Sequence, residues 1–126
     1  MVLIDTHVLI WALYDSEQLS SKARDAISER NCCVSIASLW EMSIKVFNGK
    51  LILKDTILDI GRKCTEMGVD ILPIRPEHCQ QLQSLPLYHK DPFDRMIIAQ
   101  AIVEGCPLVT KDENIWKGYD GLTKIW

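Results

Sequence analysis

The sequence predicts an α/β fold in which a single domain over residues 1–126 holds a mainly parallel central sheet flanked by helices. Short apolar segments of strand length alternate along the chain with longer segments of helical character, and this alternation is typical of a parallel sheet covered on both faces. A late helix over residues 92–104 is apolar on most of its faces, as expected for a helix buried between a sheet and other helices. No internal repeat, low-complexity segment or linker divides the chain.

The first half of the chain opens with an apolar strand, Val2–Ile4, and a helix that starts after Thr6 and includes His7–Leu13. A second helix is expected over Ser20–Glu29 and a second strand over Cys32–Ile36. A helix then runs from Ser38 to about Asn48. Its predicted start depends on the three-residue spacing of Ser38 and Glu41 before an apolar run, which matches a capping box.

The second half continues the alternation and contains the most distinctive segment of the chain. Pro92 near the start and Gly105 after the last apolar residue are the usual limits of a helix, so a long helix is expected between them. The other expected elements are a helical stretch from about Asp55 to Gly68, a strand at Asp70–Ile74, a helix at Pro76–Ser84, a strand at Pro107–Thr110 and an edge strand at Leu122–Trp126.

Four acidic residues stand at the junctions of these elements, and each has two interpretations. Asp5 and Asp112 follow strands, where open α/β sheets place their ligand sites, yet either could cap a helix or stabilise a turn. Glu41 fits a capping box but could also face the end of the sheet. Asp94 lies in the first turn of the apolar helix and is the better site candidate, whereas Asp91 is the better cap.

Carboxylates brought together in a partly buried crevice would repel one another, and a bound cation resolves this conflict. Oxygen ligands favour hard cations such as Mg²⁺ or Mn²⁺. A metal-bound water of lowered pKa can attack a phosphodiester bond. The four acids therefore predict a divalent metal site able to support hydrolysis.

The chain resembles PIN-domain ribonucleases, in particular the toxins of VapBC-type toxin–antitoxin pairs. The motifs that carry the resemblance span nearly the whole chain in the family's order, and none of the four acids departs from the pattern. The matching segments are Val2-Leu3-Ile4-Asp5-Thr6, Ser38-Leu39-Trp40-Glu41, Asp91-Pro92-Phe93-Asp94-Arg95 and Leu108-Val109-Thr110-Lys111-Asp112.

The resemblance implies a PIN-like domain that cleaves RNA endonucleolytically and is silenced by a cognate antitoxin. It also implies a homodimer. The metal-binding and catalytic set would be Asp5, Glu41, Asp94 and Asp112 with Mg²⁺ or Mn²⁺ as the cofactor. Thr6, Thr110, Asp91 and Arg95 would support this set, Arg95 by pairing with Asp94 or holding a phosphate.

Composition is consistent with this interpretation. The net charge of −3 gives no broad attraction to nucleic acid, so RNA binding would depend on local cations. No apolar run is long enough to span a membrane, and no basic leader precedes the first strand, so a cytoplasmic location is expected. The five cysteines lack a Cys-x-x-Cys pair and predict reduced thiols. His7 and His89 could lie near the acids, but structural or surface roles are favoured.

Three other protein classes are alternatives to a nuclease for a chain of this pattern. A phospho-accepting receiver domain would need an acidic pair after the first strand, and Asp5 has no acidic neighbour. A haloacid-dehalogenase-type phosphatase would need a second Asp where His7 stands. A catalytically silent PIN-like module that binds a protein partner stays open, although four intact acids argue against it.

Overall fold

A computed structural model describes residues 1–29 and 31–126, and its core is a five-stranded, entirely parallel sheet. The strands are β1 (Val2–Ile4), β2 (Cys32–Ser35), β3 (Val69–Leu72), β4 (Leu108–Val109) and β5 (Lys124–Ile125). Their order across the sheet is β3-β2-β1-β4-β5. Strand β5 lies at the edge, as predicted, and the α/β fold class is confirmed.

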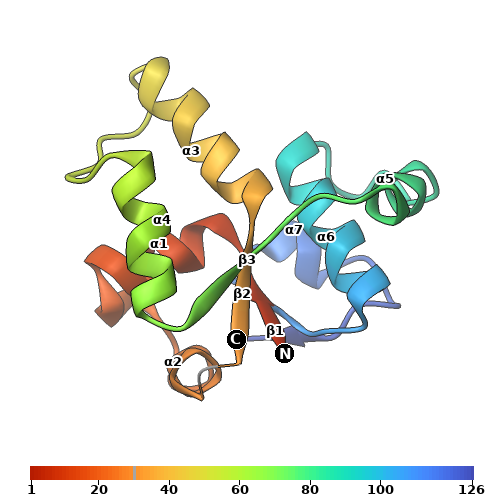
Figure 1. Cartoon of the computed structure of the whole chain (residues 1–126). Helices are drawn as coiled ribbons and strands as arrows, with labels where there is room; N and C mark the ends of the chain where they lie inside the picture. The colour runs from red at the N-terminus through yellow and green to blue at the C-terminus, as the bar shows by residue number, and fades with distance from the viewer. Residues whose placement is uncertain (30) are drawn as a thin grey trace.

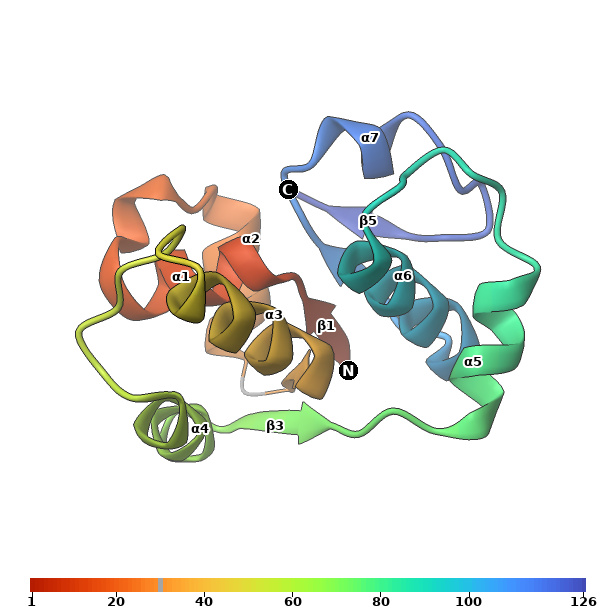
Figure 2. The same ribbon diagram turned by 90° about the horizontal axis from the view of Figure 1, so that it is seen from above.

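The helices of the described residues form one layer on each side of the sheet (Figure 1). Helices α1, α2 and α4 lie on one side, and α5, α6 and α7 lie on the other (Figures 1 and 2). The helices are α1 (Thr6–Tyr14), α2 (Ser21–Ser28), α3 (Ile36–Phe47), α4 (Ile57–Glu66), α5 (Pro76–Gln83), α6 (Pro92–Glu104) and α7 (Glu113–Trp116), with a 3₁₀ turn at Ser16–Gln18.

The alternation of side chains along the strands builds a separate core on each face. Leu3 and Leu108 belong to the core under α6, whereas their neighbours Ile4 and Val109 belong to the core under α1. Successive residues of a strand face opposite sides, so even these short strands contribute to both cores. No helix among residues 1–29 and 31–126 is long and apolar enough to cross a membrane.

The start of α3 differs from the prediction because of its cap. Helix α3 starts at Ile36 rather than Ser38, because the Ser35 hydroxyl accepts the backbone N–H of Ala37 at 3.0 Å and caps the helix directly after β2. Helix α6 begins and ends as predicted. Gly105 terminates it in the left-handed conformation, with φ +63°, which glycine adopts without steric cost.

The direction in which strands are added to the sheet reverses at β1. Strands β2 and β3 follow on one side of β1, whereas β4 and β5 lie on its other side. Open α/β sheets bind ligands beyond the carboxyl ends of their strands at such a reversal. Asp5 follows β1 and Thr110 follows β4, so both residues lie at this position.

Candidate active site

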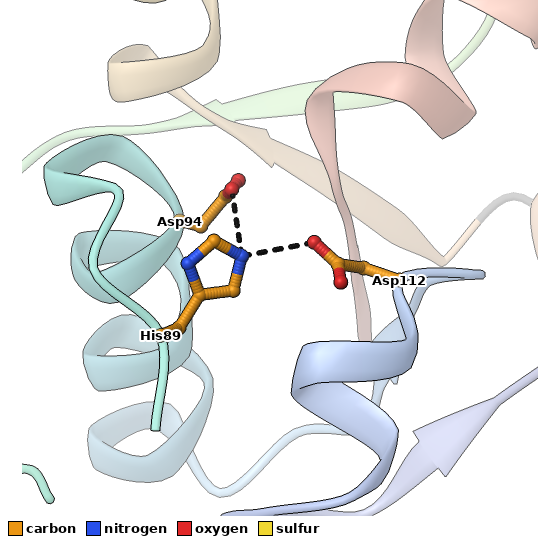
Figure 3. Close-up of side chains that lie close together, drawn as sticks. All are labelled: His89, Asp94 and Asp112. Carbon is orange, nitrogen blue, oxygen red and sulfur yellow. Dashed lines mark hydrogen bonds and ion pairs between the residues drawn. The ribbon is translucent and has the colours of Figure 1, made fainter. Parts of the chain in front are cut away.

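The four predicted acids lie near one another at the carboxyl end of the sheet. The charges of Glu41 and Asp5 both raise the pKa of Asp94, and the charge of Asp112 raises the pKa of Asp5. Figure 3 shows the carboxylates of Asp94 and Asp112 next to the same ring nitrogen of His89, a residue that the sequence did not favour for the site. The cluster therefore draws on both layers of helices.

Asp5 is both a helix cap and a member of the cluster. Its Oδ1 accepts the backbone N–H of Val8 at 2.9 Å, and its side chain is buried. Burial raises its pKa, an effect that hydrogen bonding from Thr110 and Val8 opposes. The two interpretations of this residue are compatible, because one carboxylate has two oxygens.

Glu41 does not form the expected capping box. The residue lies in the second turn of α3, since Ser35 occupies the cap. The buried carboxylate accepts a bond from the Thr6 hydroxyl at 2.8 Å and pairs with Lys45 Nζ at 2.6 Å. Thr6 thus supports Glu41 directly, and the Ser38 hydroxyl lies 2.9 Å from Thr6. Glu41 faces the crevice rather than the helix start.

Asp91 and Asp94 divide the two roles between them as predicted. Asp91 caps α6 by accepting the backbone N–H groups of Phe93 and Asp94 at 2.9 and 3.0 Å. Asp94 points into the cluster. Its pKa is raised to about 7, first by burial and then by the charges of Asp91 and Glu41. An acid of this pKa in a crevice is typical of a functional site.

Asp112 caps α7 with one oxygen and reaches the cluster with the other. Oδ1 accepts the backbone N–H of Asn114 at 2.9 Å, and Oδ2 lies 2.9 Å from His89 Nε2. The buried Thr110 hydroxyl accepts the backbone N–H of Asp112 at 3.1 Å. Thr110 therefore holds the turn between β4 and α7.

His89 joins the two halves of the acidic cluster. Its Nε2 lies 3.1 Å from Asp94 Oδ2 and 2.9 Å from Asp112 Oδ2. Its Nδ1 accepts the backbone N–H of Asp91 at 3.2 Å, so a neutral ring carries its proton on Nε2 and donates it to the carboxylates. The only signal in the sequence is the proximity of His89 to Asp91 and Asp94.

Arg95 does not pair with Asp94, which was one of the two roles expected of it. Its guanidinium donates to the backbone carbonyls of Pro86 and His89 at 3.0 and 3.3 Å, and to those of Leu82 and Leu85 at 3.4 Å. The side chain turns away from the acids and donates to these four carbonyls. Arg95 thus fixes the backbone that carries His89.

Replacement of Arg95 by Lys tests this structural role. A single ammonium cannot reach the four carbonyls that the guanidinium fork reaches. We expect Arg95→Lys to lower the free energy of unfolding by about 1–3 kcal/mol, because hydrogen bonds to charged groups carry energies of this size. Urea denaturation would measure the change. An unchanged midpoint would contradict the assignment, and Lys90→Arg, on the exposed surface of the same segment, serves as the control.

Comparison with known proteins identifies the family. The model of the PIN domain family matches residues 2–121. The chain is a PIN-domain protein. Ribonuclease VapC22 of Mycobacterium tuberculosis is 31% identical over 116 residues, which are 90% of this chain and 88% of that protein.

Solved structures share the PIN-domain fold over nearly the whole chain. VapBC2 from Rickettsia felis, bound to a DNA fragment from its promoter, aligns with a TM-score of 0.70 and 16% identity, covering 98% of this chain and 97% of that chain. FitAcB from Neisseria gonorrhoeae aligns with a TM-score of 0.67 and 17% identity, covering 98% and 96%. The expected PIN-like architecture is confirmed.

The donor set of this PIN domain fits a hard divalent cation. Four carboxylates gather there, and burial raises the pKa of both Asp5 and Asp94, so the cluster bears an electrostatic cost that a cation relieves. One ligand atom from each of His89, Asp94 and Asp112 lies within 4.8 Å of the others. Carboxylate oxygens are the ligands that Mg²⁺ and Mn²⁺ prefer.

Variants of His89 test whether its ring stabilises the metal-free PIN domain through its bonds to Asp94 and Asp112. Loss of the ring in His89→Ala leaves Asp94 and Asp112 without their shared donor, so we expect a loss of about 1–3 kcal/mol in the free energy of unfolding. Replacement by Gln places an amide N–H near the position of Nε2, so His89→Gln should restore much of that loss. Chemical denaturation in the presence of chelator provides the measurement. Equal stability of all three proteins would contradict the role.

Proposed function

We propose that this PIN-domain protein is a metal-dependent ribonuclease that hydrolyses RNA phosphodiester bonds endonucleolytically, and that it is a toxin inhibited by a cognate antitoxin. The observation that carries the proposal is the convergence of Asp5, Glu41, Asp94 and Asp112 on one crevice. It occurs in a chain that is 31% identical to a protein named as a ribonuclease. The expected location is the cytoplasm.

The four carboxylates would hold Mg²⁺ or Mn²⁺. When bound, the metal supplies an activated water and stabilises charge on the phosphoryl oxygens. The protein's contribution is to hold these carboxylates at the end of the sheet. Thr6 orients Glu41, Thr110 holds the turn before Asp112, and the caps of α1 and α7 fix Asp5 and Asp112.

Partner binding is supported by apolar side chains that the fold leaves exposed. Trp40 and Phe47 on α3 are 58% and 89% exposed. Exposed apolar surface of this kind marks interaction sites. It is available to an antitoxin segment or to a second copy of the chain in a homodimer, and the solved relatives include toxin–antitoxin complexes.

The second candidate function is a catalytically silent module that binds a protein partner. The ion pair of Glu41 with Lys45, and the hydrogen bonds of Asp94 and Asp112 with His89, favour it, because these partners hold the acidic side chains without a metal. The raised pKa of Asp94 argues that neutralisation is incomplete. Metal binding therefore separates the two functions.

The test uses the chain purified free of any bound partner and incubated with a mixed pool of single-stranded RNA. We expect cleavage in Mg²⁺ or Mn²⁺ and none in chelator, with DNA of the same sequences left intact. A lack of cleavage together with a metal-independent melting temperature would support the silent module.

A further inference from the structure

We propose that a cavity beside Asp112 is the subsite for a nucleobase that flanks the scissile phosphate, an inference that rests on the proposed ribonuclease function. The cavity has a volume of about 350 Å³ and is lined by His7, Trp11, Lys111 and Asp112. Asp112 belongs both to this cavity and to the acidic cluster. A strand of RNA held at the cluster would therefore extend directly into the cavity.

One wall of the cavity is aromatic and held in place by α1. Trp11 and His7 stand one turn apart on this helix, with ring centroids 5.9 Å apart. The Trp126 ring packs against Trp11 at 5.8 Å, and Trp11 itself is partly exposed. A rigid, partly exposed indole is a suitable platform for a base, because every nucleobase has a π-face that can stack on it.

Lys111 adds a positive charge to the lining of the cavity. Lys111 is exposed and lies between Thr110 and Asp112 in the turn after β4. Its Nζ lies 6.0 Å from the Trp11 ring centroid and 5.9 Å from that of Trp126. These distances are at the outer limit of a cation–π interaction, so little energy holds the ammonium there. Lys111 can move to a phosphate as a base enters the cavity.

The charges of the cavity favour RNA over a basic peptide as its occupant. A base stacked on Trp11 would place its own phosphate groups near Lys111 and the metal site, where both attract them. An arginine or lysine side chain would meet Lys111 and be repelled. Recognition of single-stranded RNA commonly combines aromatic stacking with such phosphate contacts. Because the chain has a net charge of −3, a local cation of this kind is needed for binding.

Steady-state cleavage of a fluorescently labelled single-stranded RNA of mixed sequence, with Mn²⁺, tests the subsite. Stacking on an aromatic ring contributes about 1–3 kcal/mol per base, which corresponds to a change of about 5- to 150-fold. We expect Trp11→Leu to raise KM by this factor with kcat within about 3-fold. Trp11→Phe keeps a ring and should recover most of the affinity. Lys111→Gln should make RNA binding less dependent on salt by about one counterion.

Several controls make the outcomes distinct. Ile52→Ala removes an apolar side chain that is 94% exposed and lies outside the cavity, and it should leave KM unchanged. Mn²⁺ affinity should be the same in wild type and Trp11→Leu, and a melting curve checks that each variant is folded. Wild-type cleavage with an unchanged KM in Trp11→Leu, or an unchanged salt dependence in Lys111→Gln, would overturn the subsite and leave the ribonuclease standing. Absence of metal-dependent cleavage by the wild type would overturn the ribonuclease function. In that case fluorescence anisotropy would compare RNA binding by the wild type and by Trp11→Leu, and equal affinities would overturn the subsite as well.

Discussion

The Asp94→Asn variant should lose RNA cleavage by at least about 100-fold while keeping its fold. Loss of residues that only orient metal ligands already costs about 10- to 100-fold, and Asp94 is proposed as a ligand itself. Asn has nearly the same shape, so the substitution leaves no void. The rate of cleavage of the RNA pool under saturating Mn²⁺ would measure the effect.

Asp91→Asn is the matched control for this prediction. Asp91 lies three residues earlier and caps α6, and Asn is as good an N-cap as Asp. We expect Asp91→Asn to retain cleavage within about 3-fold and the same melting temperature. Full activity in Asp94→Asn, or equal losses in the two variants, would show that the assignment of the two acids is wrong.

The same Asp94→Asn substitution should stabilise the metal-free protein at neutral and higher pH. Burial raises the pKa of Asp94 in the folded protein from its ordinary value of 3.8 to about 7. Between these values the folded state binds more protons than the unfolded state, so stability decreases as pH rises through this range and is constant above it. This rise in the pKa of Asp94 corresponds to a loss of at most about 4 kcal/mol in the free energy of unfolding at high pH.

Thermal or urea denaturation in chelator at pH 4 and pH 8 would measure this effect. We expect Asp94→Asn to be more stable than the wild type by about 2–4 kcal/mol at pH 8 and nearly equal to it at pH 4. The partial loss of the contact with His89 reduces the gain. Addition of Mn²⁺ should reverse the order, because only the wild type keeps all four ligands. A variant less stable than the wild type at pH 8 without metal would contradict the raised pKa.

The sequence predicted the positions of Asp5, Asp94 and Asp112 because each follows from the order of elements. The carboxyl ends of parallel strands meet at one edge, so acids after β1 and β4 converge whatever the details of packing. Asp94 was recognised because the proline and the cap fix where α6 begins, and residues of a first turn can face inward.

The roles of Glu41, His89 and Arg95 depend on details that sequence spacing does not contain. Ser35 and Ser38 are both adequate caps, and only the end of β2 decides between them. His89 lies outside any helix or strand. Its position depends on two hydrogen bonds, one from the backbone N–H of Asp91 to its ring and one from the Arg95 guanidinium to its backbone carbonyl. Arg95 donates to four carbonyls at the end of α5 and in the loop that follows it, whose path the sequence does not reveal. Helix α7 has four residues, too few for a periodic pattern.

Titration of Mn²⁺ into the partner-free protein, followed by calorimetry in the absence of RNA, tests the metal site most directly. We expect the wild type and Asp91→Asn to bind with the same affinity, and Asp5→Asn, Glu41→Gln, Asp94→Asn and Asp112→Asn to bind at least about 10-fold more weakly. Failure of the wild type to bind Mn²⁺, or equal binding by Asp94→Asn, would contradict the proposal that these four carboxylates form one divalent metal site.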